Sequence, residues 1–171
     1  MRASPWLLTP IAVLSMPAYA VSYLTIEEAQ RIIFPGTVLT ATPLTLTEEQ
    51  AREIERRAGV PVTGRALHLW RAPDGSAFIV DQVIGKHDAI GYALGINPDG
   101  RVRQVEILDY REAYGSEVRN EKWRRQFIGK GAEDPVLLDR DIRNLSGATL
   151  SSRHVTEGVK RLIATYAVAV K

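Results

Sequence analysis

Residues 146–152, Ser-Gly-Ala-Thr-Leu-Ser-Ser, form a stretch whose residue types suit the binding of a ligand. The small side chains let a ligand approach the main chain closely, and Thr149 offers a hydroxyl one or two residues before a predicted helix. Unsatisfied N–H groups and the helix dipole favour an anion at that end, so a phosphate-bearing ligand would fit. The alternative is an ordinary turn in which Ser151 or Ser152 is the N-cap.

The composition places limits on the function. The chain has 171 residues, 45% apolar and 25% charged, with a formal net charge of +2, which suits one globular domain. The basic residues are scattered, without the interleaved aromatic residues of a nucleic-acid surface, so we expect no nucleic acid partner. Cysteine is absent, which excludes disulfides, c-type haem attachment, thiolate iron–sulfur ligation and lipidated cysteine. A redox cofactor would therefore have to be organic or supplied otherwise.

Residues 1–20 have the pattern of a secretory signal peptide. Arg2 provides a positive charge, residues 6–14 form an apolar run, and Ala-Tyr-Ala at 18–20 is a small-x-small cleavage site. We predict cleavage after Ala20 and a periplasmic or otherwise exported protein. An uncleaved N-terminal anchor is the alternative, although the apolar run is short for a membrane-spanning helix.

The rest of the chain predicts a single α+β domain. Thr25 and Thr47 are expected N-caps of helices at 26–34 and 48–58, and residues 37–46 are expected to be extended. Four apolar segments joined by short turns predict an antiparallel sheet of four strands or more, at 65–71, 77–84, 89–96 and 102–110. A helix, an irregular segment and a long C-terminal helix are expected next, at 117–127, 134–138 and 153–170. The helices should pack on the sheet.

Residues 146–149, with 150–152 after them, resemble the flavinylation motif of the FMN-binding domain family. This family includes periplasmic subunits of the Rnf and sodium-pumping NADH:quinone reductase complexes. The resemblance extends from about Gly85 to Tyr166 and includes four further stretches: Gly85-Lys86-His87-Asp88, Gly91-Tyr92-Ala93-Leu94-Gly95, Tyr110-Arg111-Glu112 with Gly115, and Gln126-Phe127-Ile128-Gly129-Lys130.

The resemblance implies that FMN is the cofactor and that a flavin transferase joins it to Thr149 through a phosphoester. It also implies a membrane-bound redox partner and an FMN-binding domain at 47–171, after a helix and extended segment at 21–46. The further cofactor-binding residues that it implies are Ser146, Gly147, Ala148, Leu150, Ser151, Lys86, Tyr110, Glu112, Gly115, Phe127 and Lys130.

One position departs from the family pattern. The family usually has Asp three residues before the serine of the motif, where this chain has Arg143, and Asp141 lies two residues further back. This departure bears on the covalent attachment by the transferase rather than on flavin binding.

Each residue carried over from the family also has a structural interpretation. Lys86 and Lys130 are either solvated lysines or cations near the flavin, where a positive charge favours the reduced, anionic ring. The aromatic residues are either core residues or walls of the flavin site, and Glu112 with Gly115 is either a surface turn or a loop near the ring. The aromatic candidates are Tyr110 and Phe127, with Tyr92 and Tyr114 as weaker ones.

Other chemistries have little support in the sequence. The three histidines form no cluster of the kind that a zinc or iron site requires, so we expect no metal. A hydrolase triad of Ser146, His154 and Asp141 lacks the Gly-x-Ser-x-Gly motif, and a Gly-x-Gly-x-x-Gly motif for NAD(P)H is also absent.

The sequence thus favours an exported electron-transfer flavoprotein that carries FMN, as an electron carrier or subunit rather than a stand-alone enzyme. One alternative is a non-redox accessory or sensor module of the same fold, which Arg143 motivates. The other is a periplasmic flavin-dependent reductase in which Tyr110 or Glu112 donates a proton.

Overall fold

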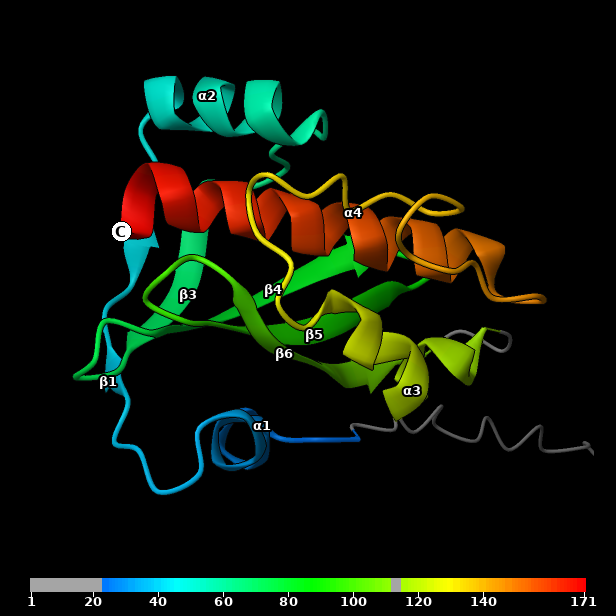
Figure 1. The fold of residues 1–171 in the computed structure, drawn as a ribbon, viewed down its shortest axis with the longest axis horizontal. Coiled ribbons are helices and arrows are strands. Elements are labelled where there is room, and N and C mark those ends of the chain that lie inside the picture. The colour runs from blue at the N-terminus through cyan, green and yellow to red at the C-terminus, as the bar shows by residue number, and fades with distance from the viewer. Residues whose placement is uncertain (1–22, 112–114) are drawn as a thin grey trace, which may run out of the picture.

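The computed structural model describes residues 23–111 and 115–171 as a layered α+β fold (Figure 1). A long helix, α4 (Thr149–Thr165), lies on one face of an antiparallel sheet, and α1 (Ile26–Ile33) lies on the other face. A third helix, α2 (Glu48–Ala58), packs on the outer side of α4. This arrangement confirms the predicted α+β class.

Some predictions fall outside the described residues: the signal peptide at 1–20, and the candidate site residues Glu112 and Tyr114. Across residues 23–111 and 115–171, no helix combines the length and the apolar character that a membrane span requires.

The sheet confirms the predicted meander. Its consecutive strands pair antiparallel and are β3 (Ala66–Arg71), β4 (Ala77–Ile84), β5 (Ala89–Ile96) and β6 (Val102–Tyr110). The first and third connections are tight turns at Asp74-Gly75 and Asp99-Gly100, because glycine accepts the positive φ that these turns need.

The threonine-rich segment before α2 completes the sheet. β1 (Thr40–Ala41) and β2 (Leu44–Thr45) both pair with β3, which gives six strands, with β1-β3-β4-β5-β6 in order and β2 beside β3. The extended conformation predicted for residues 37–46 is therefore confirmed where β1 and β2 form.

Both predicted N-terminal helices begin with a capping box. The Thr25 hydroxyl accepts from the N–H of Glu28 (3.1 Å), and the Glu28 carboxylate accepts from the N–H of Thr25 (2.8 Å). Thr47 and Gln50 make the same reciprocal pair at the start of α2. These local bonds satisfy N–H groups that a helix start leaves free, so the sequence motif alone sets the helix start.

The helix predicted at 117–127 is broken into three short pieces, and this prediction was wrong. They are a 3-10 turn at Ser116–Arg119, α3 (Glu121–Arg124) and a second 3-10 turn at Arg125–Phe127. Asn120 has extended backbone angles and its side chain accepts from the N–H of Lys122, so it stops the first turn and starts α3. Asparagine competes with the helical main chain for hydrogen bonds in this way.

The C-terminal helix begins earlier than predicted. It starts at Thr149 rather than Arg153, and a π-helical turn at Tyr166–Val170 continues it. Ser151 and Ser152 therefore lie inside the helix, and the alternative that either is its N-cap is wrong. The predicted apolar stripe on this helix is buried against the sheet, at Val155, Val159, Leu162, Ile163, Tyr166 and Val170.

Gly158 brings α4 unusually close to the sheet. A Cβ atom at this position would lie 2.5 Å from the Tyr92 hydroxyl and 2.8 Å from Cγ1 of Val83. Because a packed interior cannot shift freely to accept an added methyl group, any larger residue would push α4 away from β4 and β5.

We expect Gly158→Ala to lower the free energy of unfolding by about 1–3 kcal/mol, because it overpacks the helix–sheet contact. Urea unfolding of the full chain measures the change. Gly64→Ala is the matched control, since no atom lies within 4 Å of a Cβ built there. Equal stability of the two variants would contradict the close-packing argument.

Candidate cofactor site

The first turn of α4 carries the motif threonine at the protein surface. Thr149 is the first residue of the helix and is exposed. The sequence predicted that the helix would start one or two residues after Thr149. Ala148 is the N-cap, and among the described residues no side chain caps the helix. The first helical bond joins the N–H of Ser152 to the Ala148 carbonyl (2.8 Å), so the three preceding N–H groups have no acceptor within the helix. These groups and the hydroxyl present donors to an anion.

The two serines that follow the threonine point inward and hold this turn in place. The Ser151 hydroxyl lies 3.1 Å from the Tyr110 hydroxyl at the end of β6, and both residues are buried. The Ser152 hydroxyl donates to Oδ1 of Asn144 (2.9 Å). The start of α4 is thus attached to the sheet and to the preceding loop through side-chain oxygens that would otherwise cap a helix.

Gly115 fits against this contact. Its φ is +92°, and a Cβ atom there would lie 2.5 Å from the Tyr110 hydroxyl and 2.8 Å from Oγ of Ser151. The position therefore requires glycine for two reasons, its backbone conformation and the space available. The structure brings together three residues that the resemblance implied for the site: Tyr110, Gly115 and Ser151.

The loop before the motif is fixed by side chains from the 116–127 region. Nε1 of Trp123 donates to the Arg143 carbonyl (2.8 Å), and the Arg143 N–H donates to Oε1 of Gln126 (2.9 Å). Both main-chain groups of Arg143 are satisfied while its side chain remains exposed. The positioning roles of Trp123, Gln126 and Asn144 are not evident from the sequence, because they depend on contacts between distant segments.

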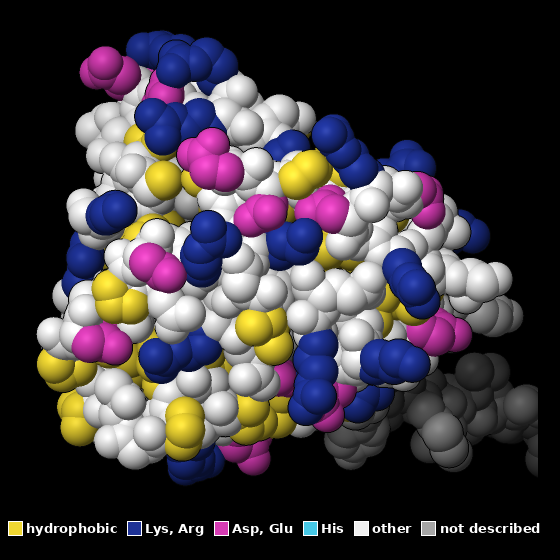
Figure 2. Space-filling view, in the orientation of Figure 1, with side chains coloured by type: hydrophobic (Ala, Val, Ile, Leu, Met, Phe, Trp, Pro, Cys, Tyr) yellow, Lys and Arg dark blue, Asp and Glu magenta, His cyan; other side chains and the backbone are white. Residues whose placement is uncertain are grey.

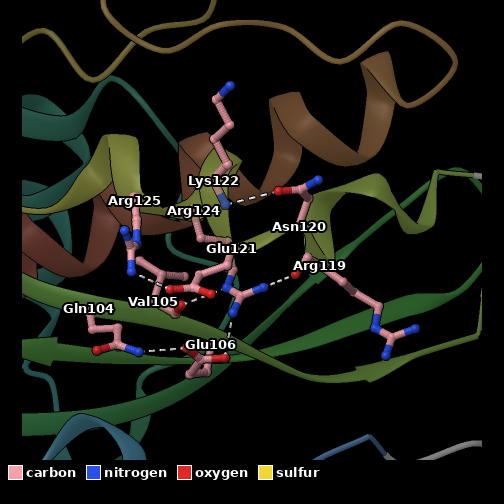
Figure 3. Close-up of polar contacts among 9 residues, drawn as sticks. All are labelled: Gln104, Val105, Glu106, Arg119, Asn120, Glu121, Lys122, Arg124 and Arg125. Carbon is pink, nitrogen blue, oxygen red and sulfur yellow. Dashed lines mark hydrogen bonds and ion pairs between the residues drawn. The ribbon is translucent and has the colours of Figure 1, made fainter.

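A buried ion pair attaches α3 to β6 (Figure 3). Nη2 of Arg124 lies 2.8 Å from Oε2 of Glu106, and Nε of Arg124 donates to the Val105 carbonyl (2.9 Å). Glu106 also accepts from the Gln104 amide (2.7 Å). Removing one partner of such a pair leaves an uncompensated buried charge. The network therefore holds α3, and through Trp123 the loop that precedes the motif.

Lys130 is engaged in an ion pair rather than free for a ligand. Its Nζ lies 2.9 Å from Oδ2 of Asp141, and both side chains are largely buried. Burial alone would raise the pKa of Asp141, but hydrogen bonds from the N–H groups of Leu137 and Val136 and from Lys130 outweigh it and lower the pKa below 3.8. This geometry supports the structural interpretation of Lys130, and its contact with FMN stays a prediction.

Two further candidates are exposed at the same end of the molecule. Lys86 lies in the β4–β5 turn, and because Ile90 pairs with Tyr110, this turn and the end of β6 share one end of the sheet. Leu150, in the first turn of α4, has 42% of its surface exposed. An exposed leucine beside the anion-binding turn offers an apolar contact to a ring.

Phe127 and Tyr92 lie in the core. Phe127 is fully buried and makes an edge contact with Trp123, with ring centroids 5.2 Å apart. Tyr92 is also fully buried, and its hydroxyl donates to Asp81 (3.0 Å). Burial and the neighbouring carboxylate of Asp81 raise the pKa of Tyr92 well above 10.0. The structure favours the packing interpretation for both aromatic residues.

Hydrolase and metal chemistry find no support in the described residues. The Asp141 carboxylate is bound by Lys130 and two main-chain N–H groups, whereas Nδ1 of His154 is buried and without a hydrogen-bond partner. The His–Asp bond that orients a catalytic triad is therefore not formed. Within residues 23–111 and 115–171, no group of three or more His, Asp or Glu side chains could hold a metal ion.

The surface around α4 is mixed in charge. Figure 2 shows Lys and Arg side chains interspersed with Asp and Glu over the face that contains α2 and α4. On this face, the interspersed charges form no stripe of positive potential along which a nucleic acid backbone would lie. A ligand at the start of α4 would thus depend on local donors rather than on a general positive field.

The donors at this turn suit a flavin nucleotide. The exposed hydroxyl and the free N–H groups of α4 fit a phosphate, and Leu150 fits one face of a ring. Residues 85–164 match the FMN-binding domain family. The chain contains an FMN-binding domain. FMN is therefore its cofactor, and the resemblance noted from Gly85 to Tyr166 is confirmed over 85–164.

The chain is also similar to a named relative. It is one subunit of the proton-translocating ferredoxin:NAD(+) oxidoreductase complex of Clostridium ljungdahlii, and it is 29% identical over 86 residues, 46% of each chain. The chain spans about half the length of this curated relative. All of the cofactor-binding residues implied by the sequence lie within the FMN-binding domain at 85–164, but their individual contacts with FMN stay predictions.

We expect Asp141→Asn to lower the free energy of unfolding at pH 7 by about 1–3 kcal/mol, because it removes the charge that Lys130 and two N–H groups stabilise. The folded-state pKa of Asp141 lies below its unfolded value of 3.8. Its stabilisation is thus fully present above pH 3.8 and is lost as the pH falls through the folded pKa.

Urea unfolding of wild type and variant from about pH 7 to about pH 2.5 measures this dependence. The difference in free energy of unfolding between wild type and Asp141→Asn should become smaller below pH 3.8. Glu133→Gln, an exposed carboxylate in the same loop, is the control and should change stability little at any pH. A difference that stays constant down to the lowest pH would rule out the assigned role of Asp141.

Proposed function

We propose that this protein is an exported electron-transfer flavoprotein in which the FMN phosphate is esterified to the Thr149 hydroxyl. The observation that carries the proposal is the exposed threonine in the first, uncapped turn of α4. In net terms, the bond from Oγ1 of Thr149 to phosphorus forms, one P–O bond of the FMN phosphate breaks, and the hydroxyl proton leaves with the displaced oxygen as water. The remaining phosphate charge would still face the N–H groups at the start of the helix.

Each residue of the turn has a defined task in this proposal. The N–H groups of Thr149, Leu150 and Ser151 bind phosphate oxygens, and the Leu150 side chain covers part of the ring. Lys86 supplies a positive charge at the same end of the sheet and would favour the reduced ring. The buried Ser151–Tyr110 contact keeps the turn fixed while the cofactor changes charge. When bound, FMN supplies the electron-accepting chemistry, and the protein sets its orientation and access.

Export, maturation by a flavin transferase and a membrane-bound redox partner belong to the same proposal. The signal-like pattern at residues 1–20 and the similarity of residues 146–149 to a flavinylation motif support the first two. The clostridial relative belongs to a proton-translocating complex, and translocation across a membrane requires membrane-bound partners. Covalent attachment would also prevent loss of FMN outside the cytoplasm, where no metabolic pool would replace it.

A non-redox accessory or sensor module is the second candidate, and Arg143 favours it. This residue replaces the usual Asp of the family, and its exposed side chain lies just before the motif. An absorption spectrum separates the two candidates, because oxidised flavin is yellow and loses its colour on reduction. Colourless protein from cells that also produce the transferase would favour the accessory module.

The covalent bond is tested by mass spectrometry of denatured protein from cells that produce the transferase. We expect wild type to gain the mass of one FMN less one water, and Thr149→Ala to gain nothing, because alanine has no oxygen to esterify. Thr149→Ser tests whether any hydroxyl suffices.

Thr37→Ala is the matched control, since Thr37 is exposed and lies far from α4 in the sequence; it should retain the flavin mass. Wild-type protein without added mass, or added mass that survives in Thr149→Ala, would refute the covalent attachment. Reversible bleaching of the bound flavin would separately test the redox role.

A further inference from the structure

The part of β4 nearest the β4–β5 turn has an open edge. β3 pairs with β4 only as far as His68 opposite Val80, because the start of β3 turns away to pair with β2. On its other side, β4 stays paired with β5 as far as Ile84. On the β3 side, the described chain has no strand that pairs with the residues of β4 after Val80.

The register identifies the main-chain groups on that edge. Gly85 donates to the Asp88 carbonyl (2.8 Å), which makes them a hydrogen-bonded pair of the β4–β5 ladder. Such pairs alternate along antiparallel strands, so Val83 bonds to β5 as well. The N–H and C=O groups of Gln82 and Ile84 therefore point to the opposite edge, where the described chain supplies no partner strand.

Two cavities lie one after the other along this edge. One, of about 410 Å³, is lined by Asp81 and Leu67 among others, and the next, of about 450 Å³, is lined by Val83 and Ile84. They share three lining residues: Thr63, Gln82 and Arg161. We call the two together the β4-edge groove. Each cavity has the volume of a typical ligand site.

The walls of the groove carry both apolar and polar side chains, and its buried charged pair is internally neutralised. Val60 and Val62, before β3, contribute to one wall, and α4 forms the other. Nη2 of Arg161 lies 2.7 Å from Oδ2 of Asp81, and only 8% of the Arg161 surface is exposed. Because each charge of this pair compensates the other, and Glu157 on α4 is the other carboxylate of the lining, the groove is complementary to an uncharged segment or to one with a positively charged end.

We propose that the β4-edge groove binds an extended segment of a partner protein, which pairs through its main chain with Gln82 and Ile84 as an added strand. A peptide group is uncharged and supplies both the N–H and the C=O that an open edge requires. Side chains that alternate along the segment would enter the two cavities in turn, so the segment carries apolar residues at every second position. This inference does not rest on the flavin assignment.

The test uses the full chain and a defined probe, an acetylated and amidated peptide of alternating valine and threonine with a lysine at each end. We expect hydrogen exchange at the amides of Gln82 and Ile84, followed by NMR, to slow at least tenfold when the peptide is saturating. The amide of Val83 already bonds to β5 and should change little. The same peptide methylated at every backbone nitrogen should give no protection, because it cannot donate to an edge.

Two variants test the groove directly. Gln82→Pro removes an N–H that points outward, a position where an edge strand accepts proline, and should abolish protection at Ile84. Thr63→Trp should fill the groove and should also abolish protection at Ile84. Val38→Trp, at an exposed position outside the groove, is the control and should bind the peptide as wild type does. Absence of protection in wild type up to millimolar peptide would overturn the proposal. Equal binding of the methylated peptide, or displacement of the peptide by equimolar FMN, would also overturn it.

Discussion

The arrangement of the cofactor site depends on two serine hydroxyls that point into the protein instead of capping a helix. Ser151 contacts Tyr110 on β6, and Ser152 donates to Asn144 in the preceding loop. These contacts extend α4 back to Thr149 and leave Ala148, which has no side-chain acceptor, at the N-cap. The open N–H groups that suit a phosphate are therefore a consequence of burying the hydroxyls nearest to them.

Elements governed by local signals could be predicted from the sequence. The capping boxes at Thr25 and Thr47 and the turns at Gly75 and Gly100 each depend on residues at most three apart. Predictions based on them agree with the structure within a residue or two. The start of α4 could not be predicted in this way, because it depends on Tyr110, which lies 41 residues from Ser151. The prediction of one helix over 117–127 did not include the break at Asn120, a residue that competes with the helical main chain for hydrogen bonds.

The residues of the candidate site also differ in whether the sequence alone could predict their positions. The motif at 146–149 is recognisable by its resemblance to the flavinylation motif of the family, and the structure exposes Thr149 and Leu150. Lys130 and Phe127 could not be placed from the sequence, because an ion pair with Asp141 and an edge contact with Trp123 are tertiary contacts. The β4-edge groove likewise lies where the start of β3 pairs with β2 instead of β4. The sequence of β4 itself does not predict this pairing.

The setting of Thr149 is assembled from segments that come together only in the folded protein. β6 contributes Tyr110, α3 holds the loop through Trp123, and Asn144 receives Ser152. A nascent or unfolded chain contains the same four motif residues without this arrangement. A flavin transferase that recognises the assembled turn would thus act only after the protein has folded. Unfolded chains would not receive FMN.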